Sequence, residues 1–156
     1  MGKSLAIVIL SLFTCRFCVP KVDRVSDVKE IDSYLKEKEK QLGVAENTYK
    51  VIPQIESTVS LVNCKDILES GKDRFIAAAF GADDFTADFE VYRSADDKEL
   101  DFARKWFALC CHATGVTSID TPYVHFKNTE GLSEELSYLK SIGMKAKFAI
   151  HPTQID

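Results

Sequence analysis

Short apolar runs alternate with amphipathic segments along this chain of 156 residues, and this alternation constrains the fold more than any other feature. The runs have turn residues at their ends, which is typical of strands that are buried on both faces. The segments between them carry apolar residues at helical spacing and end at glycine, as many helices do. Strands that alternate with helices predict a parallel sheet with helices packed on its faces.

We expect strands over residues 17–22, 51–55, 75–80, 117–120 and 148–150. Helices are expected from about Ser26 to Gly43, from about Thr58 to Gly71, from about Asp97 to Gly115, and over residues 132–142. Residues 81–94, with three aspartates, are expected to form a long loop. An eight-stranded α/β barrel needs about 250 residues. About five strands therefore predict either a small open α/β sheet or part of a barrel.

Composition predicts one globular domain and excludes some classes of partner. The hydrophobic fraction is 46%, and 20 Lys and Arg residues stand against 24 Asp and Glu, a net charge of −4. No basic stripe is present, so we expect no nucleic-acid partner. The apolar run from Leu5 to Cys15 is too short for a stable membrane span.

The first 17 residues differ in character from residues 18–156, which we expect to form the domain. Lys3 followed by an apolar run is typical of a signal peptide, but Arg16 stands where small residues are needed for cleavage. The alternatives are a substitute strand over a sheet edge, a buried helix, or the boundary of a truncated gene product. Five cysteines, an odd number in a chain of this length, do not predict a disulfide framework, and Cys110 and Cys111 are expected to be core or semi-buried thiols.

Two carboxylates are the strongest candidates for a functional site. Glu56 directly follows the apolar run 51–55, and Asp84 comes soon after the run 75–80. If these runs are neighbouring parallel strands, both side chains converge at the edge of the sheet where α/β folds place their chemistry. Two hard oxygen ligands with no adjacent His or Cys favour Mg²⁺ as the cofactor.

The ordered motifs at the strand ends resemble those of a known family. They are Pro-Lys-Val at 20–22, Ile-Pro-Gln-Ile-Glu-Ser at 52–57, Phe-Gly-Ala-Asp-Asp-Phe at 80–85, Ser-Ile-Asp at 118–120 and Ala-Ile-His-Pro-Thr-Gln-Ile at 149–155. Together they are similar to the citrate lyase beta subunit-like family (HpcH/HpaI aldolases and citrate lyases). The greatest likeness is to the animal citramalyl-CoA lyase-like members.

This resemblance implies a partial (β/α)8 TIM barrel that contains about the last five β/α units. It implies a Mg²⁺-dependent carbon–carbon lyase that cleaves a hydroxyacyl-CoA thioester, such as citramalyl-CoA or malyl-CoA, to an acyl-CoA and a keto acid. Glu56 and Asp84 match the metal-binding carboxylates, and Ile150 and His151 match positions that line the substrate pocket. The family is often trimeric, so a homo-oligomer is expected. Mitochondrial localisation is implied, with secretion or the cytoplasm as alternatives because of the atypical N-terminus.

The chain also departs from the family pattern. The arginines and the acidic motif of the family's first three strands are absent from this sequence, as is the C-terminal extension that supplies a catalytic Asp. We therefore assign no catalytic residue. The alternative function is a non-catalytic, truncated member that acts as a structural or regulatory partner. From the residues alone, Arg104 is expected to pair with a neighbouring acid, and Asp120 to orient strand ends or cap a helix.

Overall fold

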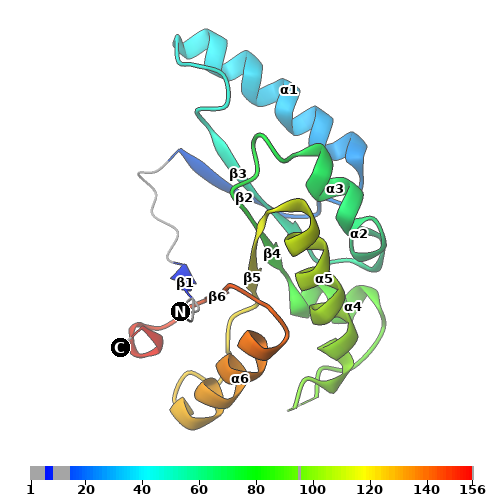
Figure 1. The fold of residues 1–156 in the computed structure, drawn as a ribbon, viewed down its shortest axis with the longest axis vertical. Helices are drawn as coiled ribbons and strands as arrows, with labels where there is room; N and C mark the ends of the chain where they lie inside the picture. Colours follow the sequence, from blue (N-terminus) through cyan, green and yellow to red (C-terminus); the bar gives the residue numbers. More distant parts are fainter. Residues whose placement is uncertain (1–5, 9–14, 95, 156) are drawn as a thin grey trace.

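A computed structural model describes residues 6–8, 15–94 and 96–155 of the chain. Within these ranges, six strands form one parallel sheet in the order β1-β6-β5-β4-β3-β2 (Figure 1). Their bounds are β1 Ala6–Val8, β2 Arg16–Val19, β3 Lys50–Ile55, β4 Ala77–Phe80, β5 Thr117–Asp120 and β6 Ala146–Phe148. From β2 to β6, each new strand pairs with the one before it, so the sheet grows in a single direction.

The helices connect successive strands. They are α1 Val25–Leu42, α2 Thr58–Val62, α3 Cys64–Ser70, α4 Ala82–Asp88, α5 Asp101–Thr114 and α6 Thr129–Ser141, with short 3-10 helices at Lys98–Leu100 and Pro152–Gln154. Helix α3 packs against both α1 and α5. Gly43 and Gly115 end α1 and α5 in the left-handed conformation that glycine adopts most readily.

The helices share one core with one face of the sheet. Val51 and Ile55 of β3 belong to the cluster that includes buried residues of α1, α3, α5 and α6, whereas Ile52 belongs to a second cluster. That second cluster contains strand residues on the opposite face, most of them alanine: Ile52, Ala77, Ala79, Ile119 and Ala146. Helices on one face are the arrangement of a barrel wall, whereas a doubly wound sheet carries helices on both faces.

Three local predictions were wrong. The expected loop 81–94 contains helix α4, because Ala82 and Phe85 are buried at helical spacing and acids occupy its first turn. The helix expected after Thr58 is divided at Asn63 into α2 and α3. The last strand is Ala146–Phe148, earlier than 148–150, and pairs Ile119 with Ala146 and Asp120 with Lys147.

Strand β1 extends the sheet beyond β6. Its residues Ala6 to Val8 pair in parallel with Ala146 to Phe148. Residues 1–5 and 9–14 lie outside the described residues, so the signal-peptide interpretation of the N-terminal segment lies outside them too. Among the helices that the structure describes, none has the length and apolar composition needed to cross a membrane.

A buried ion pair fixes the end of α1 to the sheet. Arg74, which precedes β4, binds both carboxylate oxygens of Glu39, with Nη1–Oε1 2.9 Å and Nη2–Oε2 3.2 Å. The Glu39 carboxylate also accepts hydrogen bonds from the backbone N–H groups of Tyr49 and Asn47. The hydrogen bonds from Arg74, followed by those from the backbone, lower the pKa of Glu39 to about 2 although burial opposes this.

We predict that Glu39→Gln lowers the free energy of unfolding at pH 7 by roughly 3 kcal/mol, because buried Arg74 then keeps only the partly exposed Asp32 as a charge partner among the described residues. A lowered pKa stabilises the fold above the unfolded pKa of about 4.3 and loses this effect as the pH falls toward 2. The wild type should therefore lose stability over this window more steeply than the variant. Denaturant unfolding between pH 7 and pH 2.5 measures both effects.

Glu37→Gln is the matched control, because Glu37 lies on the same helix and is exposed. We expect it to change stability by less than about 0.5 kcal/mol. Equal effects of the two variants would contradict the importance of the Glu39–Arg74 pair.

Candidate functional site

The carboxyl ends of all the strands lie at one edge of the sheet, because every pair of neighbouring strands is parallel. The residues that follow β2, β3 and β4 therefore gather at this edge. Among them are Lys21, Glu56 and Asp84. The structure thus brings the two predicted carboxylates to neighbouring strand ends, as expected from their positions in the sequence.

Hydrogen bonds hold both the backbone and the side chain of Glu56. Its N–H donates to Ser60 Oγ at 3.1 Å, in the first turn of α2, and its Oε1 accepts a hydrogen bond from the Lys21 N–H at 2.8 Å. Lys21 has φ of 55°, a left-handed conformation that is unfavourable for a residue with a side chain. Backbone strain of this kind occurs often at functional sites, where the surrounding structure maintains it.

Gly81 makes room for the Glu56 side chain. A Cβ at position 81 would lie 2.7 Å from Glu56 Cβ and 2.8 Å from Oε2, closer than non-bonded atoms approach. Burial of Glu56 raises the pKa of its carboxyl group, and the charge of Asp84 adds to this, while the Lys21 N–H opposes it. The contribution from Asp84 indicates that the two carboxylates interact electrostatically.

Asp84 lies in the first turn of α4 and is exposed. Among the described residues, no hydrogen bond or ion pair engages its carboxylate, whereas the neighbouring Asp83 pairs with Arg93 at 2.6 Å. Asp88, one turn further along α4, accepts hydrogen bonds from the backbone N–H and the hydroxyl group of Thr58 at 2.7 and 2.6 Å. This contact joins the segment that carries Asp84 to the segment that carries Glu56.

The pair of carboxylates suits a hard cation such as Mg²⁺, which is commonly bound through one or two carboxylates and several waters. Among the residues that the structure describes, His, Cys, Asp and Glu side chains form no cluster of three or more that could hold a metal ion. The metal-ligand roles of Glu56 and Asp84 therefore stay a prediction. Two observations are consistent with this prediction. Gly81 leaves space for the Glu56 carboxylate, and no described residue pairs with the Asp84 carboxylate.

The predicted substrate residues lie elsewhere along the same edge. Ile150 is exposed after β6, and His151 stacks on Phe126 with ring centroids 4.5 Å apart. His151 Nδ1 also accepts a hydrogen bond from the Thr153 N–H at 3.3 Å, as the cap of the last 3-10 helix. Strands β4 and β5 separate β6 from β3, which is roughly 14 Å across a sheet.

A buried charge network lies beside this edge. Arg104 of α5 binds Asp120 at the end of β5 through Nε–Oδ1 at 3.0 Å, and it binds Glu135 of α6 at 2.7 Å. Lys147 of β6 contacts Asp120 Oδ2 at 2.7 Å and Glu135 at 3.0 Å. The expectation that Arg104 pairs with an acid is confirmed. Glu135 was not identified from the sequence, because an acid on an amphipathic helix gives no signal of burial.

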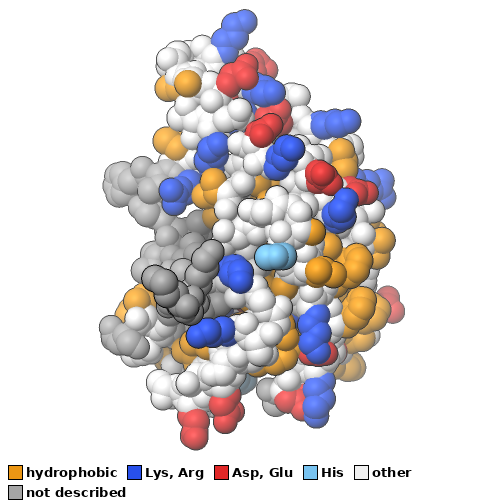
Figure 2. Space-filling view, viewed as in Figure 1, with side chains coloured by type: hydrophobic (Ala, Val, Ile, Leu, Met, Phe, Trp, Pro, Cys, Tyr) orange, Lys and Arg blue, Asp and Glu red, His pale blue; other side chains and the backbone are white. Residues whose placement is uncertain are grey.

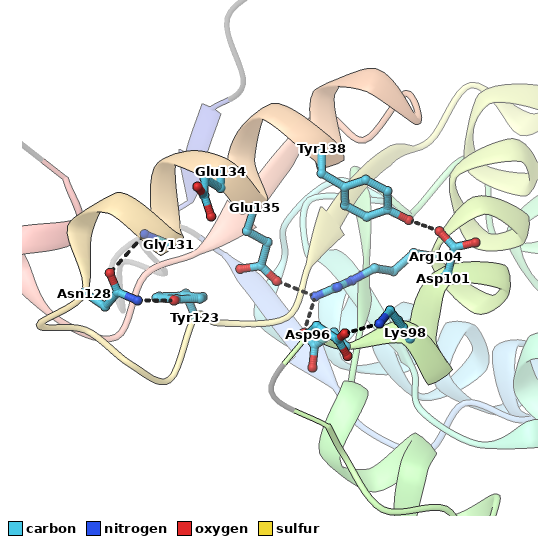
Figure 3. Close-up of a pocket in the computed structure, with 11 residues that line it drawn as sticks. Asp96, Lys98, Asp101, Arg104, Tyr123, Asn128, Gly131, Glu134, Glu135 and Tyr138 are labelled. Carbon is cyan, nitrogen blue, oxygen red and sulfur yellow. Dashed lines mark hydrogen bonds and ion pairs between the residues drawn. The ribbon is translucent and has the colours of Figure 1, made fainter.

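The same network borders a cavity of about 530 Å³ between α5 and α6 (Figure 3). Arg104 and Glu135 are hydrogen-bonded to each other in its wall, and Tyr138 donates a hydrogen bond to Asp101 at its rim. None of Glu56, Asp84, Ile150 and His151 lines this cavity. Most of its charged residues are paired with one another, so we assign the cavity to the structural network and not to the candidate metal site.

Residues 2–152 match the protein family described as HpcH/HpaI aldolase/citrate lyase. Citrate lyase subunit beta of Leuconostoc mesenteroides subsp. cremoris is 30% identical over 138 residues, which are 88% of this chain and 45% of that protein. The mitochondrial citramalyl-CoA lyase of Mus musculus is 28% identical over 117 residues, which are 70% of this chain and 35% of that protein. The greater likeness expected to the animal enzymes is therefore not supported. The chain spans about half the length of the first of these relatives, and less of the second.

Comparison with solved structures confirms the fold. The citrate lyase beta subunit of M. tuberculosis, in complex with oxaloacetate and magnesium, aligns with a TM-score of 0.73 and 23% identity. The alignment covers 92% of this chain and 59% of that chain. The strands and helices of this protein therefore correspond to part of a TIM barrel, as predicted.

We predict that Arg104→Met lowers the free energy of unfolding by roughly 3–5 kcal/mol. The variant removes one of the two cations that pair with the Asp120 and Glu135 carboxylates, and Asp120 is fully buried. Lys105→Met is the control, since Lys105 is half-exposed and, within the described part of the chain, its one ion pair is with Asp101 one turn away. We expect it to cost less than about 1 kcal/mol. Urea unfolding measures both values, and a small effect of Arg104→Met would contradict a structural role for the network.

Proposed function

Because this chain belongs to the HpcH/HpaI aldolase/citrate lyase family, we propose that it carries the metal-binding part of a carbon–carbon lyase. The proposed reaction is Mg²⁺-dependent cleavage of a hydroxyacyl-CoA thioester, such as citramalyl-CoA or malyl-CoA, to an acyl-CoA and a keto acid. The observation that carries the proposal is the convergence of Glu56 and Asp84 at adjacent strand ends, with Gly81 leaving room for the Glu56 carboxylate.

In this proposal, Glu56 and Asp84 supply the carboxylate ligands. When bound, Mg²⁺ supplies Lewis acidity toward carboxylate and carbonyl oxygens of the keto acid. The Lys21 N–H and the Ser60 hydroxyl group orient Glu56, and the Thr58–Asp88 contact fixes α4 against the start of α2. The Glu56 carboxylate is thereby oriented before any ligand arrives, which limits the ordering cost of binding.

Ile150 and His151 are proposed to contact the substrate. Their place after β6, on the same sheet edge as Glu56, is consistent with this role if the sheet curves as a barrel wall does. Cleavage also needs a general base for the hydroxyl proton, and we assign this role to no residue of the chain. Likeness to the mouse enzyme supports a mitochondrial location, whereas the Leuconostoc relative is bacterial.

A non-catalytic role is the second candidate, because we assign the general base that cleavage needs to no residue that the structure describes. In that case the chain acts as a structural or regulatory partner of a longer family member. The two candidates differ in turnover, and either is compatible with retained metal binding.

The first test is a thermal melt of the purified chain with and without Mg²⁺. A ligand that binds only the native state stabilises it by RT ln(1 + [L]/Kd), about 1.4 kcal/mol when the concentration is ten times Kd. We expect 10 mM Mg²⁺ to raise the midpoint of the wild type but not that of Glu56→Gln or Asp84→Asn. Asp83→Asn is the control, because Asp83 is an adjacent acid that already pairs with Arg93. A midpoint that Mg²⁺ shifts equally in all four proteins would refute the metal site.

As the pH falls, metal binding should begin to weaken at a higher pH than it would at two carboxylates with ordinary pKa values. Mg²⁺ competes with protons for its ligands, and the pKa of Glu56 is raised above the usual value of about 4.3. The Mg²⁺-induced shift should therefore decline as the pH falls through this raised pKa. Melts at a series of pH values measure this decline, and a shift that persists unchanged to pH 4 would contradict Glu56 as a ligand.

Turnover separates the lyase from the non-catalytic candidate. The wild type is incubated with citramalyl-CoA or malyl-CoA and Mg²⁺. The released keto acid is measured as NADH oxidation by an added 2-hydroxy-acid dehydrogenase, which reduces the keto acid. Release that requires Mg²⁺ and is lost in Glu56→Gln supports the lyase. Mg²⁺ binding without release supports the second candidate.

A further inference from the structure

Three buried cysteines lie together where α3 packs against α5, and neither candidate function uses them. Cys64 is the first residue of α3, and Cys110 and Cys111 lie toward the C-terminal end of α5. All three belong to the core that the helices share and are at most 3% exposed. They are free thiols in the structure. The helices that carry them run side by side (Figure 1).

Cys64 and Cys110 contact one another directly. The Cys64 thiol donates a hydrogen bond to Cys110 Sγ, and the backbone N–H of Lys65 donates a second one. The hydrogen bond from Cys64 lowers the pKa of the Cys110 thiol most, the Lys65 N–H also lowers it, and burial opposes both. The same hydrogen bond and burial raise the pKa of Cys64. Cys110 is therefore the thiol of the pair that reaches the reactive thiolate form more readily.

Cys111 is a poorer partner for either residue. On a helix its side chain points about 100° away from that of Cys110, and burial raises the pKa of its thiol. Neighbouring Cα atoms are about 3.8 Å apart, less than the separation of about 4.4 Å or more that a disulfide usually spans. The three cysteines are also no metal centre, because His, Cys, Asp and Glu side chains in the described ranges form no such group. The contact therefore favours a single pairing, Cys64 with Cys110.

We propose that Cys64 and Cys110 form a reversible disulfide that joins α3 to α5 when the protein meets hydrogen peroxide. The Cys110 thiolate attacks one peroxide oxygen, the O–O bond breaks, and a sulfenic acid and hydroxide result. The hydroxide takes up the proton that the Cys110 thiol released. The Cys64 sulfur then attacks the sulfenic sulfur, so that an S–S bond forms and water leaves. Two thiols are oxidised by two electrons in total, and one peroxide is reduced to two waters.

The position of the pair suits a small oxidant. Helices α3 and α5 belong to the layer whose outer side faces the solvent in the space-filling view (Figure 2). Leu109, next to Cys110 in the chain, is 58% exposed, and the side chain of Lys65 is exposed to the same extent. Cys110 thus lies just beneath the surface, where opening of one helix turn admits a molecule as small as peroxide.

The disulfide would join two neighbouring β/α units, because α3 follows β3 and α5 comes after β4. It would close a loop of about 45 residues, and a link of this length stabilises a fold mainly by restricting the unfolded chain. The stability of the protein would then depend on the redox state of this pair. Neither the bond nor its test involves metal binding or turnover, so the outcome is independent of the proposed lyase function.

Peptide mapping of the full chain tests the proposal. The protein is reduced, freed of reductant and treated with hydrogen peroxide while folded, and the remaining thiols are then blocked with iodoacetamide in denaturant. We expect the loss of two of the five free thiols and a tryptic cross-link between peptides 51–65 and 106–127. Fragmentation should place the bond on Cys64 and Cys110, and dithiothreitol should break it.

Serine variants supply the matched controls. Cys64→Ser and Cys110→Ser should each abolish the cross-link, whereas Cys111→Ser should retain it, because it replaces an adjacent buried thiol that the proposed bond does not use. Should a variant fail to fold, the wild-type map still decides, since fragmentation assigns the bond. A wild type that keeps all five thiols would overturn the proposal, and so would one that gains about 16 Da per added oxygen without a cross-link. A bond that requires Cys111 would overturn it as well.

Two further measurements report on the folded protein. The disulfide should raise the melting midpoint of the wild type by roughly 5–15 °C relative to the reduced protein. Trp106, the only tryptophan of the chain, lies one helix turn before Cys110, and a disulfide quenches nearby tryptophan fluorescence. Its emission should fall on oxidation and recover with dithiothreitol in the wild type and in Cys111→Ser, but not in Cys64→Ser. A cross-link that leaves the midpoint unchanged would contradict the stabilising role.

Discussion

The fixed hand of the strand-to-strand crossovers is the constraint on which the rest of this structure depends. Each crossover from β2 to β6 adds the next strand on the same side of the last one. Because parallel crossovers are right-handed, an order that grows in one direction places every connecting helix on one face of the sheet. The other face keeps small residues such as Ala77 and Ala79. Because all the strands are parallel, their carboxyl ends lie at the same edge of the sheet, and residues far apart in the sequence come together there.

Buried arginines connect the helices to this sheet at two places. Arg74 joins α1 to the segment before β4 through Glu39, and Arg104 joins α5 to β5 and α6 through Asp120 and Glu135. Removing two charges from water is costly, and the cost is offset only when their geometry satisfies most hydrogen-bonding groups. Both clusters meet this condition with bidentate contacts to a carboxylate. They specify which helix lies against which strand, whereas apolar packing alone allows small shifts.

The candidate metal site depends on contacts between successive β/α units. Glu56 belongs to one unit, yet the Lys21 N–H that orients it comes from the unit before, and the space at Gly81 comes from the unit after. Asp88 of α4 also accepts a hydrogen bond from the backbone N–H of Thr58. Each unit is therefore incomplete without its neighbours at this edge.

The sequence by itself determined the α/β class, the order of the five strands β2 to β6, and the placement of Glu56 and Asp84 after neighbouring strands, because these depend on local periodicity and on the geometry of parallel strands. It also indicated that Arg104 pairs with an acid. Only the tertiary structure decided that α4 begins directly after Gly81, that β6 ends before residue 149, and that Glu135 and Lys147 share Asp120 with Arg104. These features arise from contacts between residues distant in sequence. Burial of a charge and the exact end of a strand are set by such contacts, and no local pattern of residues encodes them.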